Sequence, residues 1–144
     1  MMTYITSESF WECARNLDDK RLSKQRYDCL RIMQIIADPE HKSANHPVVL
    51  LWKDDPSGLL NYSRSICDEY RTRQYHLNQP EIETVFDQIL KVWENVKQPY
   101  GSEPCWRNCS ALIDSHRAAL LHKNPGWYSR WMWKVTPRVK YFWP

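Results

Sequence analysis

Three polar residues at helical spacing are the first candidates for a catalytic or binding role in this sequence. Arg21, Gln25 and Asp28 lie four and three residues apart. On an α-helix, which turns by about 100° per residue, they share one line along the surface. A carboxylate beside an arginine suits acid–base chemistry next to a bound phosphate. The alternative is a structural ion pair at the edge of the core, since such pairs also perturb pKa values.

The helix that must carry these residues is predicted over residues 18–37. Apolar side chains recur there with helical period, and Pro39 closes the segment. The polar line borders the apolar stripe through Leu22 and Cys29, so it lies at the edge of the core. The side chains of Lys20, Lys24 and Arg31 are expected to point well away from that stripe, toward solvent.

Cationic side chains gather in the same segment and again near the end of the chain. The two groups are Lys20, Arg21, Lys24, Arg26 and Arg31, and Arg130, Lys134, Arg138 and Lys140. The net charge is only +3, but eight Trp and eight Tyr accompany these cations. Cations interleaved with aromatic rings favour a nucleic-acid partner, through phosphate contacts and base stacking. The structural alternative is that the aromatic side chains fill the core.

A second dense polar patch runs through residues 114–128. Arg117 and Lys123 are candidate phosphate contacts in it. His116 falls on the apolar side of its predicted helix, where a hydrogen-bonded core histidine is more common than a catalytic one. Both interpretations of His116 are open.

Several other chemistries lack their usual signals. Cys105 and Cys109 have no second pair and no histidine at zinc-finger spacing, so we expect no metal. Glycine-rich phosphate loops, nucleophile elbows and HExxH motifs are absent from the sequence. An odd number of cysteines, five, without a signal-peptide pattern favours a reduced, intracellular protein. The longest apolar run, Val48–Trp52, is too short to span a membrane.

The remaining pattern predicts an all-α fold, a compact single domain over residues 1–144 with five or six helices. The predicted helical segments are 8–16, 18–37, 46–52, 59–75, 81–97 and 109–123. Asn45 and His46 precede Pro47 as candidate helix caps, whereas Asp54, Pro56 and Gly58 interrupt the pattern. Residues 98–108 are predicted as a loop, and the aromatic C-terminal tail is expected to wrap the helical body.

Several stretches of the sequence resemble one enzyme family. Three are similar to the phage pyrimidine-dimer DNA glycosylases, endonuclease V: LDDKRLSKQRYDCLRI, LLNYSRSICDEYRTRQY and CSALIDSHRAALLHKNPGWY. Four resemble more closely a group of small phage and bacterial proteins related to that enzyme: LDDKRLSKQR, NHPVVLLW, SHRAALLHKNPGWY and YFWP. The likeness covers most of the chain outside residues 78–108.

The resemblance implies a helical DNA-repair enzyme that kinks DNA at a pyrimidine dimer, flips out a base and needs no metal or cofactor. The family's nucleophile is the α-amine of a threonine exposed by methionine removal. This amine forms a Schiff base with the sugar, and β-elimination then nicks the strand. A terminal amine suits the step because its pKa is below that of lysine. Thr3 matches the nucleophile if translation starts at Met2, and Asp28 falls where the family has its essential glutamate.

The sequence departs from the family pattern at several points, one being that the first long helix begins several residues later than in the family's enzymes. Tyr27 stands where the family has an arginine, and aspartate at position 28 reaches one methylene less far than glutamate. Met1 and Met2 precede Thr3, although methionine is normally removed only before a small residue. The expected DNA contacts are Arg21, Lys24, Gln25, Arg26, Arg31, Asn45, His46, His116, Arg117 and Lys123.

The leading hypothesis is a DNA glycosylase with AP-lyase activity. It would act as a monomer, in the cytoplasm of a bacterial or phage-infected cell, on double-stranded DNA carrying a pyrimidine dimer or another modified base. A non-catalytic nucleic-acid or nucleotide binder on the same scaffold is the first alternative. A helical protein that docks on an acidic partner is the second. The sequence leaves open which base is recognised and what residues 78–108 do.

Overall fold

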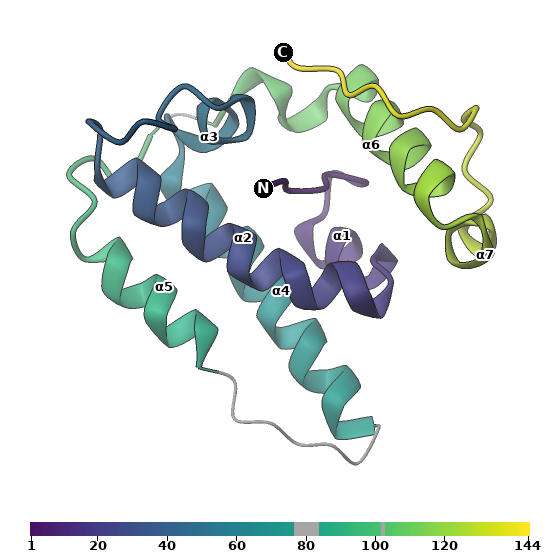
Figure 1. Cartoon of the computed structure of the whole chain (residues 1–144), viewed down its shortest axis with the longest axis horizontal. Coiled ribbons are helices and arrows are strands. Elements are labelled where there is room, and N and C mark those ends of the chain that lie inside the picture. Colours follow the sequence, from purple (N-terminus) through teal and green to yellow (C-terminus); the bar gives the residue numbers. More distant parts are fainter. Residues whose placement is uncertain (77–83, 102) are drawn as a thin grey trace.

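The computed structural model describes residues 1–76, 84–101 and 103–144, and all regular structure in these ranges is helical. The prediction of an all-α fold is therefore confirmed (Figure 1). The α-helices are α1 Phe10–Asn16, α2 Asp19–Ala37, α3 Pro47–Trp52, α4 Pro56–His76, α5 Val85–Trp93, α6 Ser110–Lys123 and α7 Pro125–Tyr128. Two short 3₁₀ turns, η1 Cys105–Asn108 and η2 Ser129–Trp131, complete the set. None of the helices described is long and apolar enough to cross a membrane.

α2 is the helix against which α4 and α5 pack. Its apolar face, including Leu22, Cys29 and Ile32, is fully buried, as the helical period predicts. Asp18 precedes the helix with extended backbone, and its carbonyl accepts the N–H of Leu22 at 2.8 Å. The predicted start of this helix is thus correct to within one residue.

α4 begins earlier than its sequence pattern predicts. We expected Asp54, Pro56 and Gly58 to interrupt the helix, and that expectation is wrong. Pro56 occupies the first helical position, where its missing N–H has no intrahelical partner to lose. Asp55 caps the helix, because its Oδ1 accepts the backbone N–H of Gly58 at 3.0 Å. A Cβ at Gly58 would lie only 2.2 Å from Asp55 Oδ2, so the cap needs glycine there.

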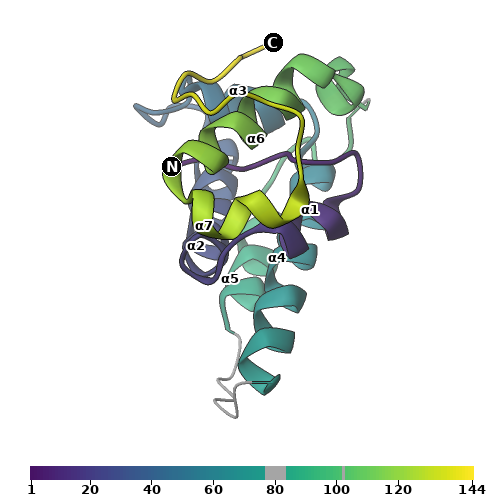
Figure 2. The same ribbon diagram turned by 90° about the vertical axis from the view of Figure 1, so that its right-hand side faces the viewer.

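The first nine residues form no helix and run as an extended segment through the middle of the molecule. Figure 1 and Figure 2 show this segment with α2 and α4 on one side and α6 on the other. Ile5, Thr3 and Thr6 are buried in it. The N–H of Ile5 donates to Nδ1 of His116 at 2.8 Å, which ties the segment to α6.

α6 supports both the N-terminal segment and the C-terminal tail. Residues 132–144 contain no helix or strand and return along α6, where the N–H of Arg138 donates to the carbonyl of Ala118 at 3.2 Å. The N–H of Phe142 donates to Oγ of Ser115 at 3.1 Å. The tail therefore wraps the helical body, as predicted (Figure 1).

Three other boundaries differ from the prediction, the first being the start of α1, which lies at Phe10 and not at residue 8. The helix predicted over 81–97 is shorter, because α5 ends at Trp93 and a tighter turn follows, in which the N–H of Asn95 donates to Val92 at 2.9 Å. Residues 81–83 of that prediction lie outside the described residues. The predicted loop, 98–108, contains the turn η1.

Candidate functional site

Five of the predicted site residues line one small cavity of about 190 Å³. They are Arg21, Lys24, Gln25 and Asp28 from α2, and Lys123 from the end of α6; Met2, Tyr4 and Lys20 complete the lining. The spacing of the polar line on α2 thus brings its members to the cavity, as the helical period predicts. Cations predominate in this cavity, which suits a phosphate-bearing ligand.

Asp28 faces the start of the chain. The backbone N–H of Met2 donates to Oδ2 of Asp28 at 3.3 Å. Lys24, one turn earlier on α2, forms an ion pair with the same oxygen at 2.8 Å. The carboxylate is mostly buried, with 15% of the side chain exposed, whereas the Lys24 side chain is 63% exposed.

His46 lies close enough to the start of the chain for charge to act on it. Burial, and then the positive charge of the Met1 α-amino group, lower the pKa of His46. Its Nδ1 accepts the N–H of Val48 at 3.2 Å, so His46 caps α3 as predicted. Asn45, which was predicted beside it as a DNA contact, is exposed.

Thr3, the predicted nucleophile, lies in the core. Its side chain is fully buried, and its hydroxyl accepts the indole N–H of Trp52 at 2.9 Å. The backbone nitrogen observed against Asp28 belongs to Met2, one residue earlier. A free amine on Thr3 would exist only in a chain that begins at that residue.

Gln25 is buried, which does not fit the expectation that it contacts DNA. Its Oε1 accepts the N–H of Tyr4 at 3.1 Å, and its Nε2 donates to the carbonyl of Met2. Both ends of the amide are therefore engaged by backbone. Only 1% of the residue is exposed.

Arg21 is held at the cavity by a buried carboxylate. Its Nη1 lies 3.2 Å from Oδ2 of Asp18. The hydroxyl of Tyr128 donates to the other oxygen of Asp18 and accepts its backbone N–H at 3.0 Å. This arrangement fixes Asp18, and through it the direction of the guanidinium.

Tyr4 also lines the cavity. Burial and a hydrogen bond with Tyr141 raise the pKa of Tyr4.

Arg26 and Arg31, two further predicted phosphate contacts, lie away from the cavity. Arg26 is buried, with its guanidinium carbon 3.5 Å from the ring centroid of Tyr70, a cation–π contact. Arg31 is exposed, and its Nη2 lies 3.2 Å from Nε2 of His41. Arg26 therefore packs within the helical body, and Arg31 contributes to the solvated face.

His116 is a core histidine, the interpretation that its position on the apolar face favoured. Burial lowers the pKa of His116 to about 3, so its ring is neutral at ordinary pH. Because Nδ1 accepts the N–H of Ile5, the proton sits on Nε2, which is buried and has no hydrogen-bond partner among the described residues.

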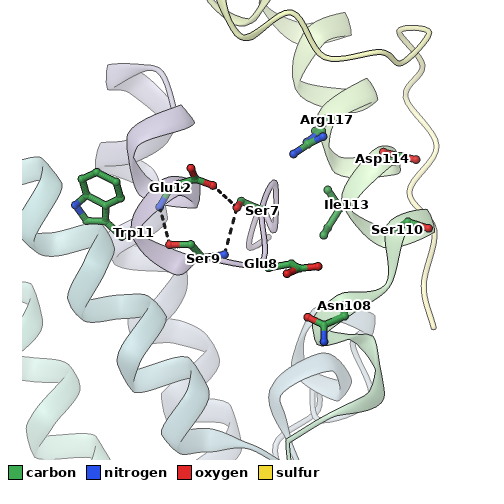
Figure 3. A pocket seen from close by; sticks show the side chains of 10 residues that line it. All are labelled: Ser7, Glu8, Ser9, Trp11, Glu12, Asn108, Ser110, Ile113, Asp114 and Arg117. Carbon is green, nitrogen blue, oxygen red and sulfur yellow. Dashed lines mark hydrogen bonds between the residues drawn. The ribbon is translucent and has the colours of Figure 1, made fainter.

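Arg117 lines a different pocket, of about 700 Å³, between α6 and the residues before α1 (Figure 3). Its Nε donates to the carbonyl of Thr6 at 2.8 Å. Three carboxylates line this pocket with it, those of Glu8, Glu12 and Asp114. The pocket is acidic overall, and the cavity at Asp28 suits a phosphate better. Among the residues described, no three His, Cys, Asp or Glu side chains come together as metal ligands.

Three contributors to the site were missed by reasoning from the sequence. Tyr62 and Trp52 bind the N-terminal segment, and Tyr128 holds Asp18. The sequence indicated a buried position for Tyr62, because this residue falls on the same helical face as Leu59. In the structure Tyr62 is fully buried. Trp52 contacts Thr3, and Tyr128 contacts Asp18; the two partners are separated by 49 and 110 positions in the sequence, respectively. No local sequence pattern indicates contacts over such separations.

The family of the chain follows from a comparison of its sequence with protein families. Residues 1–83, more than half of the chain, match the family described as pyrimidine dimer DNA glycosylase. The protein belongs to this family. Membership implies a DNA substrate and a role in DNA repair. No curated protein and no solved structure matches the chain.

Proposed function

We propose that this protein is a DNA glycosylase with AP-lyase activity that uses an α-amine at the start of its chain. Its substrate is double-stranded DNA carrying a pyrimidine dimer or another modified base. The observation that carries the proposal is that the start of the chain lies against Asp28 in a cationic cavity, with the backbone amide of Met2 3.3 Å from Oδ2 of Asp28. This nitrogen is an α-amine only in a chain that begins at Met2. Family membership gives the substrate class.

The proposed reaction uses a neutral amine and one carboxyl group. The amine nitrogen bonds to C1′ of the damaged nucleotide as the bond from C1′ to the base breaks, and the base nitrogen takes up a proton. A base that belongs to a dimer stays joined to its neighbour. Opening of the sugar ring then gives a protonated Schiff base. Loss of a proton from C2′ expels the 3′ phosphate and cuts the strand. Asp28 is the group that exchanges protons with the sugar and the amine.

The cations around the cavity bind the phosphates that flank the reacting sugar. Arg21 is the best placed of them, because Asp18 and Tyr128 fix its direction. Lys20 and Lys123 add charge at the rim. In the proposal the enzyme works as a monomer, inside the cell, and without a metal or cofactor.

The first test is reduction with borohydride during reaction on ultraviolet-irradiated duplex DNA. The proposal predicts a covalent protein–DNA complex and a nicked strand. The assay uses two forms of the protein, one that begins at Met1 and one processed to expose Thr3. If neither form gives a trapped complex or a nick, the proposal is contradicted.

Binding to DNA without cleavage is a second candidate, favoured by the buried position of Thr3. It predicts an affinity that falls with salt but no trapped complex. Lys20→Gln and Lys123→Gln should each reduce the slope of log affinity against log salt by about 1. Lys91→Gln, an exposed cation on α5, is the matched control. An affinity independent of salt would contradict both candidates.

A further inference from the structure

Two side chains from different helices grip the N-terminal segment beside Asp28. Gln25, on α2, donates to the carbonyl of Met2 and accepts the N–H of Tyr4 at 3.1 Å. Its amide thus bonds the backbone on both sides of Thr3, as a neighbouring β-strand would. The grip acts on backbone groups, so it fixes the path of the chain whatever its side chains are.

Tyr62, on α4, contacts the same backbone from the opposite helix, and the two side chains together form a clamp around residues 2–4. Its hydroxyl oxygen lies 2.9 Å from the carbonyl oxygen of Tyr4 and 3.1 Å from Oε1 of Gln25. The same hydroxyl accepts the N–H of Tyr4 at 3.1 Å. Tyr62 is fully buried, so water does not compete for these bonds.

The contacts allow one register of the segment. An extended chain advances by about 3.3 Å per residue, and its side chains alternate between faces. A slip by one residue would carry the Met2 nitrogen beyond hydrogen-bond reach of Asp28. It would also turn the Thr3 hydroxyl away from the indole of Trp52.

We propose that Gln25 and Tyr62 are positioning residues, which hold the N-terminal backbone in register so that the nitrogen at position 2 faces Asp28. This inference rests on the proposed function for its catalytic meaning. The clamp itself, Gln25 and Tyr62 around residues 2–4, is a property of the fold and can be measured separately. In the proposed reaction both residues act through the backbone of residues 2–4 and not on the sugar itself.

The test uses Gln25→Met and Tyr62→Phe, which keep side-chain size and remove the hydrogen bonds. Ser63→Ala is the matched control, because this buried hydroxyl donates to the carbonyl of Leu59 on its own helix at 2.7 Å and interacts with Cys29 on α2. None of the hydrogen bonds described for it reaches the N-terminal segment. Hydrogen exchange of the Tyr4 amide reports the clamp without any substrate. The single-turnover rate of borohydride trapping, and its pH profile, report positioning.

We expect exchange at Tyr4 to become at least tenfold faster in both clamp variants, and trapping at least tenfold slower. The midpoint of the pH profile should shift, the dissociation constant for DNA should stay within about twofold, and Ser63→Ala should match the wild type. Unchanged exchange and trapping would overturn the inference, as would slow trapping that merely follows lost DNA binding. If one clamp variant fails to fold, the other decides. If the wild-type protein is never trapped, the proposed function fails, while exchange at Tyr4 still decides whether the clamp exists.

Discussion

The backbone nitrogen of Met2 lies 3.3 Å from Oδ2 of Asp28, although 26 residues separate the two in sequence. α2 supplies the carboxylate, and the extended first residues bring the nitrogen to it. The same oxygen also binds Lys24. An acid, a cation and the start of the chain therefore meet in one small cavity.

Asp28→Asn should abolish most strand cleavage while leaving DNA binding nearly intact. The amide keeps the shape of the side chain but cannot exchange a proton. We expect the single-turnover rate to fall by about 100-fold or more, in line with the loss of a general acid or base. The dissociation constant should change by less than about threefold.

The control for this change is Asp38→Asn, which alters an exposed carboxylate at the other end of α2. It should behave as the wild type. Asp28→Glu should retain activity, because it restores the acid that the resemblance implies at this position. Equal rates for Asp28→Asn and the wild type would exclude a proton-transfer role for the carboxylate.

Tyr128→Phe should lower stability and weaken DNA binding together. The change leaves the buried Asp18 carboxylate with one hydrogen-bond donor fewer and frees Arg21 to reorient. We expect a loss of about 1–3 kcal/mol in the free energy of unfolding, the usual penalty for an unsatisfied buried group. Urea titration measures this loss, with the exposed Tyr27→Phe as control. Unaltered stability and affinity would show that Tyr128 does not hold Arg21 in place.

His116 should make the protein less stable as the pH falls below 6.5. The folded protein keeps this ring neutral, with a pKa of about 3, whereas the unfolded chain has an ordinary histidine pKa of 6.5. The unfolded state therefore binds more protons between these values, and the free energy of unfolding decreases as the pH drops. The contribution is complete above pH 6.5. It falls by about 2 kcal/mol between pH 7 and pH 5.

The measurement is a series of urea titrations from pH 7 to pH 5. His116→Asn, which can still accept the Ile5 N–H, should lose this part of the pH dependence. His122→Asn, at an exposed position on the same helix, should keep it. A wild-type protein as stable at pH 5 as at pH 7 would contradict a neutral, buried His116.

The sequence predicts α2 and its polar line well, because a long periodic helix determines by itself which residues share a face. Arg21 and Asp28 line the same cavity for that reason. The burial of Gln25 was not predicted, since a polar side chain alone suggests exposure to solvent, whereas its partners are backbone atoms 21 and 23 residues away. The position of Thr3 was equally hidden. An extended segment that is surrounded by helices shows no hydrophobic periodicity in its sequence. Its partners, Trp52, Tyr62 and His116, lie far along the chain.

The most direct test of the proposed function is to map the residue that becomes joined to DNA. After borohydride trapping on irradiated duplex DNA, the complex is digested and the modified peptide is identified by mass spectrometry. The account predicts one adduct, on the α-amine of the first residue, which forms far more slowly in Asp28→Asn. An adduct on the side chain of Lys24 or Lys123, or the absence of any adduct, would contradict it.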